Sequence, residues 1–161
     1  MRCIESRKDF IESLKTKADS LKPEELFLIA DLYMGGEVSG NVPEDRIEGM
    51  FWLKKSAEAG LPIAQYTLGF WCKSRPEVFE LGKYIKQSQE EAFYWFKLSA
   101  EGGYVSAYFE LGKAYKYGLG CEKDVLQAKY WLEKAVVEEG NAWAMVELQE
   151  INMSESGKKD K

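Results

Sequence analysis

The sequence contains no histidine among its 161 residues. Imidazole is the usual general base near neutral pH and the commonest zinc ligand in proteins. The chain also has no apolar run near the roughly 18 residues that a membrane-spanning helix needs. Its first residues, 1–9, lack the apolar stretch of a signal peptide. These absences argue against histidine-dependent catalysis, zinc binding through histidine, and a membrane-embedded or secreted protein.

Cysteine is scarce and positive charge is not in excess. The three cysteines, Cys3, Cys72 and Cys121, lie far apart in the sequence. An odd and scattered set without a signal peptide indicates reduced thiols and therefore a cytoplasmic protein. The formal net charge of −5 makes binding to nucleic acid or to an anionic membrane surface unfavourable. We expect a soluble protein whose partner is another protein or a peptide.

What the chain does contain is one stretch that occurs three times. Each copy begins with a helix-capping residue, followed three positions later by Glu or Gln and seven positions later by Trp. The caps and tryptophans are Asp45 and Trp52, Ser88 and Trp95, and Asp124 and Trp131. The first spacing is that of a capping box, in which cap and N3 side chains each accept a backbone N–H. Three copies at one offset from a Trp predict an internal repeat.

A second helical pattern precedes each tryptophan helix. In the second and third copies, Ala, Leu and Gly stand at offsets 0, +4 and +5, as Ala64, Leu68 and Gly69 and as Ala107, Leu111 and Gly112. Gly inside a helix costs roughly 1 kcal/mol relative to Ala. Its recurrence at one offset therefore predicts close approach of a neighbouring helix. Repeated helix pairs predict an all-α fold, an α-solenoid of stacked helix-turn-helix repeats.

The spacing of the patterns gives the domain organisation. It predicts three repeats, at 23–60, 61–103 and 104–140. The other segments are predicted as an N-terminal capping helix, a C-terminal helix and a flexible tail, at 1–22, 141–151 and 152–161. The second repeat carries an insertion over residues 73–86. Tolerated length variation at a surface turn explains the insertion, although its Phe79 and Tyr84 leave open a contact with the partner.

The combined pattern resembles the Sel-one-like repeat family, a relative of tetratricopeptide repeats. The third repeat carries the family pattern nearly in full, at Ala107, Leu111, Gly112, Tyr115, Gly118, Gly120, Asp124, Ala128, Trp131, Lys134, Ala135 and Gly140. The second repeat departs from it, with Cys72 in place of Tyr and Ser88 in place of Asp. The resemblance implies a right-handed superhelix in which the first helix of each repeat lines the concave side and the second helix lies outside.

The candidate partner-binding residues lie on the first helices. Offsets +2, +6 and +9 fall on the face opposite the apolar stripe of each first helix. We call this set the groove face: Phe27, Asp31, Tyr66, Phe70, Lys73, Phe109, Lys113 and Lys116. Aromatic side chains supply anchor points for a partner segment, and lysines near one edge would suit acidic side chains. An alternative is that Tyr66 and Phe109 pack between neighbouring repeats.

No constellation of catalytic residues, cofactor motif or metal-ligand set is found. We therefore expect a non-enzymatic interaction module, an adaptor or scaffold that holds a partner segment in the groove. An enzyme is disfavoured because Cys72 and Cys121 have no histidine to activate them. A further alternative is an immunity protein or inhibitor that neutralises a toxin or enzyme through acidic surface at Glu48, Glu58, Glu133, Glu138, Glu139 and Glu150. A homodimer through the apolar C-terminal edge, at Trp143, Met145 and Val146, also remains open.

Overall fold

The computed structural model describes residues 13, 16–17, 20–34, 43–74 and 88–159. Within these residues the regular elements are helices, and no strand is found. The helices are α2 (Pro23–Met34), α3 (Pro43–Glu58), α4 (Pro62–Lys73), α5 (Gln89–Glu101), α6 (Val105–Tyr117), α7 (Val125–Glu139) and α8 (Ala142–Lys159). The predicted N-terminal capping helix lies largely outside the described residues, as does most of the predicted insertion.

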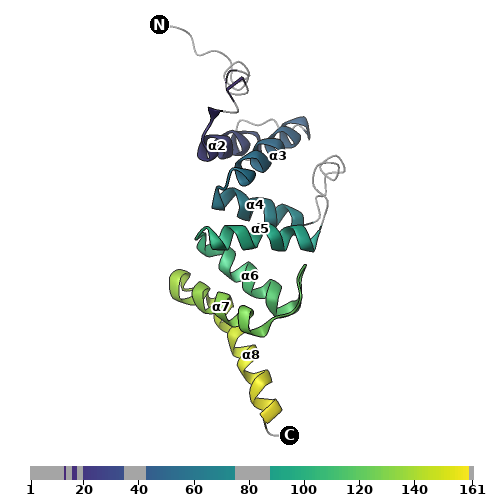
Figure 1. Ribbon diagram of the computed structural model, residues 1–161, viewed down its shortest axis with the longest axis vertical. Coiled ribbons are helices and arrows are strands. Elements are labelled where there is room, and N and C mark those ends of the chain that lie inside the picture. The colour runs from purple at the N-terminus through teal and green to yellow at the C-terminus, as the bar shows by residue number, and fades with distance from the viewer. Residues whose placement is uncertain (1–12, 14–15, 18–19, 35–42, 75–87, 160–161) are drawn as a thin grey trace.

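Consecutive helices form pairs, and the pairs stack. The pairs are α2 with α3, α4 with α5, and α6 with α7, which we call repeats one, two and three. The second helix of each repeat packs on the first helix of the next, and α7 packs on α8 in the same way. Figure 1 shows the repeats following one another along the long axis, with α8 leaving the stack alone at the C-terminal end. This is the all-α solenoid that the sequence predicts.

Two clusters of buried side chains form the core. The first belongs to repeats one and two and includes Ile29, Trp52, Leu53, Leu68 and Phe96. The second belongs mainly to repeat three and α8 and includes Leu111, Leu132, Ala144 and Ile151. Of the repeated tryptophans, Trp52 is fully buried, while Trp95 and Trp131 are half-buried and pack against the two clusters. No helix within the described residues is long and apolar enough to cross a bilayer.

The predicted caps are confirmed at two of the three positions. The Ser88 hydroxyl accepts a hydrogen bond from the Glu91 N–H at 3.1 Å. The Asp124 carboxylate accepts from the backbone N–H groups of residues 126 and 127. In repeat one the prediction is wrong, because α3 already begins at Pro43 and the backbone of Asp45 is helical. Proline is favoured in the first turn because the N–H it lacks would have no partner there.

In a capping box the backbone N–H of the cap residue donates to the N3 side chain. Here it donates instead to a carbonyl of the preceding helix. The Ser88 N–H donates to the Cys72 carbonyl at 3.2 Å, and the Asp124 N–H donates to the Tyr115 carbonyl at 3.0 Å. Cys72 and Tyr115 hold the same offset, +8, in their first helices. These two bonds therefore tie the start of each second helix to the same position of its own first helix.

A buried hydroxyl also links the two helices of repeats one and two. Ser56 donates to the Pro23 carbonyl and Ser99 to the Pro62 carbonyl, both at 2.7 Å. Both serines are completely buried. Repeat three has Ala135 at the corresponding place and lacks this bond. The link is thus a feature of the first two repeats only.

The glycines inside the first helices lie where the helices meet. A Cβ atom on Gly112 would be 2.7 Å from Leu132 Cγ, and one on Gly69 would be 2.9 Å from Phe96 Cδ1. Real Cβ atoms do not approach other carbons so closely, because such distances are well inside van der Waals contact. The close approach predicted from the sequence is confirmed for repeats two and three.

Repeat one makes the same close approach with the small residues exchanged. Ala30 occupies the glycine offset of its first helix, and Gly49 stands in the second helix where repeats two and three have Ala92 and Ala128. A Cβ on Gly49 would lie 3.0 Å from Tyr33 Cβ and 3.3 Å from the Ala30 carbonyl oxygen. Each repeat therefore carries one Gly and one Ala at these two offsets, and only the helix that carries the Gly changes.

The last helix is longer than the sequence predicts. The prediction ends it at Ile151 and assigns 152–161 to a tail, but α8 continues to Lys159. Ile151 is buried, and Glu155 forms an ion pair with Lys129 of α7 at 2.5 Å. These contacts with repeat three extend the helix through polar residues that show no apolar periodicity of their own.

Candidate functional site

The groove face is only partly open to solvent. Its members range from exposed (Asp31, Phe70) through half-buried (Phe27, Tyr66, Lys73, Phe109, Lys113) to buried (Lys116). Offset +2 carries an aromatic residue in every repeat, namely Phe27, Tyr66 and Phe109. Phe70, at offset +6 of repeat two, is 50% exposed. The face therefore presents a row of half-buried rings with one prominent phenylalanine beside it.

Tyr66 packs between neighbouring repeats. Its ring centroid lies 5.7 Å from that of Phe96 and 5.1 Å from that of Tyr104. It contacts both core clusters. Burial raises the pKa of the Tyr66 phenol, and the nearby Glu110 carboxylate adds to the rise. For this residue the contacts are those of the packing alternative. Phe109 is also half-buried and lies under the Lys113 ammonium, which is 5.0 Å from its ring centroid.

Two of the groove lysines are used inside the chain. Lys73 Nζ lies 2.6 Å from Glu110 Oε2, and Lys116 Nζ lies 2.6 Å from Glu147 Oε2 and 2.7 Å from Glu150 Oε2. In both cases a lysine at offset +9 pairs with a glutamate at offset +3 of the following first helix. These two lysines, which the sequence analysis assigned to acidic side chains of a partner, instead join successive first helices of the same chain.

The Lys116 contact is the most enclosed of these ion pairs. Lys116 is 9% exposed. Although burial alone would lower it, hydrogen bonds to Glu147 and Glu150 raise the pKa of the Lys116 ammonium above its ordinary value. Burial likewise opposes ionisation of Glu147, but the bonds from Lys116 and Tyr117 hold its pKa below the ordinary value. Lys116 therefore fixes α8 against repeat three.

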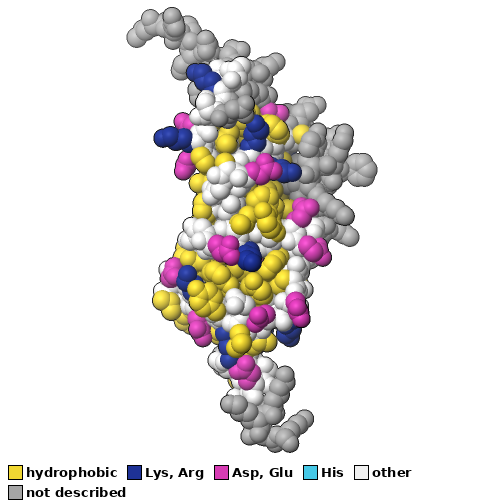
Figure 2. Space-filling view, in the orientation of Figure 1, with side chains coloured by type: hydrophobic (Ala, Val, Ile, Leu, Met, Phe, Trp, Pro, Cys, Tyr) yellow, Lys and Arg dark blue, Asp and Glu magenta, His cyan; other side chains and the backbone are white. Residues whose placement is uncertain are grey.

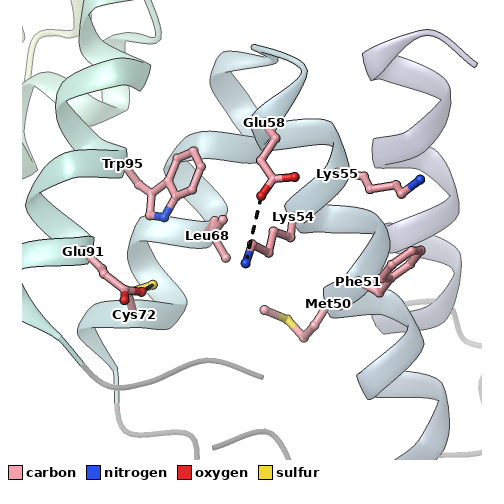
Figure 3. A pocket seen from close by; sticks show the side chains of 9 residues that line it. All are labelled: Met50, Phe51, Lys54, Lys55, Glu58, Leu68, Cys72, Glu91 and Trp95. Carbon is pink, nitrogen blue, oxygen red and sulfur yellow. Dashed lines mark hydrogen bonds and ion pairs between the residues drawn. The ribbon is translucent and has the colours of Figure 1, made fainter. Parts of the chain in front are cut away.

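The structure contains a second candidate site that the sequence analysis misses. A cavity of about 360 Å³ lies between α3 and α5 and is lined by Met50, Phe51, Lys54, Lys55, Glu58, Leu68, Cys72, Glu91 and Trp95. Figure 3 shows Trp95 and Glu91 on one side, with Met50, Lys54 and Glu58 facing them from α3. We call it the junction cavity. Cys72 is at offset +8, so the cavity opens on the side of α4 away from the groove face.

The polar lining of the junction cavity includes a thiol, two lysines and two glutamates. Cys72 is 1% exposed, and burial, reinforced by the Glu91 carboxylate, raises the pKa of its thiol to about 12. The Cys72 thiol donates a long hydrogen bond to Glu91 Oε2 at 3.8 Å. Lys54 and Glu58 form a loose ion pair of 3.9 Å at the rim. A neutral thiol is a poor nucleophile.

A departure from the repeat pattern explains the cavity. In repeat three Tyr115 stands at the Cys72 position and packs edge to face on Phe93, with ring centroids 5.2 Å apart. Met50 occupies the Phe93 position in repeat one. The space thus lies where two aromatic rings are replaced by smaller side chains. The replacement of Tyr by Cys72 is visible in the sequence and is the signal from which this site could have been predicted.

Hydrophobic side chains also reach the surface. Figure 2 shows them in patches along the middle of one face over α4 to α7, with charged side chains between the patches and toward the margins. The large exposed hydrophobic residues include Phe51, Phe70, Tyr94, Tyr130, Trp143 and Met145. Exposed apolar patches are typical of surfaces that bind other proteins.

Comparison with known proteins identifies the repeats. The sequence matches the Sel1 repeat over residues 26–61, 62–104 and 105–136. The chain belongs to the Sel1 repeat family. Sel1 repeat proteins generally mediate protein–protein interactions and are typically non-catalytic. A comparison with curated proteins finds no match.

Solved structures show the same architecture. A Sel1 repeat protein from Oxalobacter formigenes is 31% identical, with a TM-score of 0.67 over 87% of this chain and 97% of that one. A protective antigen of uropathogenic Escherichia coli with an SLR fold is 28% identical, with a TM-score of 0.54 over 83% of this chain and 34% of the antigen. Helicobacter pylori cysteine-rich protein B, at 18% identity and a TM-score of 0.55 over 84% of this chain and 94% of that one, shares the fold.

Proposed function

We propose that this Sel1 repeat protein is a non-enzymatic adaptor or scaffold that holds a segment of a partner protein on the groove face. The row of half-buried rings at offset +2, with the exposed Phe70 beside it, is the observation that supports this most directly. Partly exposed aromatic side chains supply large contact area at low cost in conformational entropy.

The charges on the groove face favour an apolar partner segment over a strongly acidic one. Lys73 and Lys116 are neutralised by glutamates of the same chain. Asp31 remains exposed, and Lys113 lies over the ring of Phe109. Apolar side chains of the partner would supply the main contacts, with a single carboxylate paired to Lys113.

Affinity capture from native lysate tests the groove. The double variant Phe70→Ala/Phe109→Ala removes two rings and leaves Tyr66, which packs between repeats, in place. The matched control is Tyr94→Ala/Tyr130→Ala on the second helices, where the side chains are 54% and 51% exposed. We expect the wild type and the control to capture a protein that the groove variant loses, with equal helicity by circular dichroism. Capture of that protein by all three forms would contradict the groove assignment.

A second copy of the chain is the proposed partner of α8. Trp143 is 73% exposed and Met145 52% exposed, and no further helix covers them within the described residues. Light scattering across a concentration series should give a dimer that Trp143→Glu/Met145→Glu converts to a monomer. A wild type that stays monomeric at high concentration excludes this pairing.

The cytoplasmic location is also a proposal, supported by the free thiols of Cys72 and Cys121. Alkylation in intact cells should label Cys121 and find no disulfide.

The immunity or inhibitor alternative has less support, because most of its acidic residues have partners within the chain, at Glu48, Glu58, Glu138, Glu139 and Glu150. A toxin gene beside this one would favour that alternative.

A further inference from the structure

The equivalent position one repeat later shows which side chain fits the junction cavity. We call the contact of α3, α4 and α5 the first junction, and that of α5, α6 and α7 the second. At the second junction Tyr115 places its ring edge to face on Phe93, at 5.2 Å and an interplanar angle of 87°. At the first junction Cys72 and Met50 take these two positions and the cavity remains.

The two junctions share their backbone frame. The Ser88 N–H donates to the Cys72 carbonyl at 3.2 Å, as the Asp124 N–H donates to the Tyr115 carbonyl at 3.0 Å. Leu68 and Trp95 line the cavity, and their counterparts at the second junction are Leu111 and Trp131. Because these bonds fix the helices, loss of the ring leaves an open space instead of a collapsed contact. The volume of about 360 Å³ falls within the usual range for ligand pockets.

From this correspondence we propose that the junction cavity binds a tyrosine side chain of a partner protein. The partner's ring takes the place that Tyr115 fills one repeat later. Two carboxylates line the cavity, Glu58 and Glu91, and either can accept a hydrogen bond from a phenol. Within the described residues, the side-chain hydrogen bond to Glu91 is the long one from the Cys72 thiol, at 3.8 Å. Tyrosine is therefore preferred over phenylalanine.

This site is independent of the groove. Leu68 and Cys72 point to the opposite side of α4 from Phe70. A partner could engage both faces, or the cavity alone. The groove variant Phe70→Ala/Phe109→Ala should therefore keep tyrosine binding, so that failure of one proposal can be told apart from failure of the other.

The probe is N-acetyl-tyrosinamide, titrated into the full chain labelled with ¹⁵N. The indole N–H signals of Trp95 and Trp131 report the first and second junctions in one spectrum. We expect the Trp95 signal to shift with saturation, at a Kd on the order of 1 mM for so small a ligand. The Trp131 signal should stay in place, and N-acetyl-phenylalaninamide should bind several-fold more weakly.

Two reciprocal variants sharpen the test. Cys72→Tyr should fill the cavity from within and weaken binding at least tenfold, and the double variant Met50→Phe/Cys72→Tyr should do the same with the full aromatic pair. Tyr115→Cys should open a second cavity, after which the Trp131 signal shifts as well. A gain of binding at the second junction cannot result from misfolding.

Several outcomes would overturn the proposal. The Trp95 and Trp131 signals of the wild type would shift together if the ligand bound nonspecifically. Cys72→Tyr would retain binding, with an unchanged thermal transition, if the ligand lay elsewhere. Binding of p-cresol without N-acetyl-tyrosinamide would mean that the cavity takes free phenols and not a partner side chain. If N-acetyl-tyrosinamide bound only to the variant Phe79→Ala/Tyr84→Ala, the natural occupant of the cavity would be an aromatic side chain of this chain's own insertion.

Discussion

At the second junction the rings of Tyr115 and Phe93 fill the space between successive second helices, whereas at the first junction Cys72 and Met50 leave a cavity there. The hydrogen bond from the cap N–H to offset +8 is the same in both. The helix arrangement is therefore set by backbone bonds and by the close approach of the two helices of each repeat at its glycine. Side chains at the junction are free to vary, and this variation can turn a structural position into a binding site.

The first helices differ between the junctions as well. Repeats two and three are joined by the Lys73–Glu110 ion pair, while repeat one has Met34 and repeat two Thr67 at the corresponding places. Met34 packs against the first core cluster, and the Thr67 hydroxyl donates to a carbonyl of its own helix. Because each repeat of a solenoid contacts only its neighbours, each interface can be changed without rebuilding the next.

The largest expected change in the free energy of unfolding comes from exchanging Tyr and Cys between the two junctions. Tyr115→Cys removes a ring that packs on Phe93 and should lower the free energy of unfolding by about 2–4 kcal/mol. Cys72→Tyr fills a space that already exists and should change it by less than about 1 kcal/mol. Urea unfolding of the two variants measures both values. Equal destabilisation would show that the first junction has no room for a ring.

Gly112→Ala should also destabilise the chain, although Ala is the better helix former by about 1 kcal/mol. Its Cβ would lie 2.7 Å from Leu132 Cγ and 3.2 Å from the Leu132 backbone nitrogen, so a rotamer change cannot relieve the overlap. We expect a net loss of about 1–2 kcal/mol in urea unfolding. A gain in stability would mean that α6 and α7 separate easily.

Ser99→Ala tests the hydroxyl link that repeat three lacks. The hydroxyl of Ser99 is buried and donates to the Pro62 carbonyl at 2.7 Å. Its loss should cost about 1 kcal/mol, the usual net value of such a bond. Repeat three shows that Ala135 is accepted at this place, so the melting curve should stay cooperative. A loss above about 3 kcal/mol would instead indicate a change in helix packing.

A double-mutant cycle can convert the ion pair of the second junction into the residues of the first. Lys73→Met and Glu110→Thr, alone and together, should show a coupling of about 0.5–1 kcal/mol in urea unfolding. The pair is partly buried, at 30% and 14% side-chain exposure, so moderate salt should reduce the coupling without abolishing it. Zero coupling would leave the Lys73–Glu110 contact without a role in stacking the repeats.

The architecture was predictable because its signals are local and repeated. The spacing from cap to Trp and the glycines at offset +5 locate the helix pairs, and the contacts of Gly69 and Gly112 confirm what those glycines require. The start of α3 was misplaced because two capping signals compete, Pro43 and Asp45. The length of α8 depends on contacts with α7, such as Lys129 to Glu155, which no periodicity encodes.

The candidate sites were harder to predict, because they depend on what neighbouring repeats leave unfilled. A helical wheel places Tyr66 and Lys116 on the groove face, but it cannot show that Tyr104 covers the first or that Glu147 pairs with the second. The junction cavity arises from the absence of a ring at Cys72, and an absence becomes a space only when the helices around it are fixed.

The smallest expected effect is the pH dependence of stability that the Cys72 thiol contributes. Burial, together with Glu91, raises the pKa of the Cys72 thiol to about 12, above the ordinary value of 9.0. The unfolded chain therefore loses this proton first, so the stabilisation is complete only well below pH 9 and declines as the pH rises through 9 toward 12. Between pH 8 and pH 9 the change should be a few tenths of a kcal/mol. Urea unfolding of wild type and Cys72→Ala across this range isolates the contribution as the difference in slope. Cys72→Ala should give the flatter dependence, and identical slopes would mean that the thiol is as exposed to solvent in the folded chain as in the unfolded one.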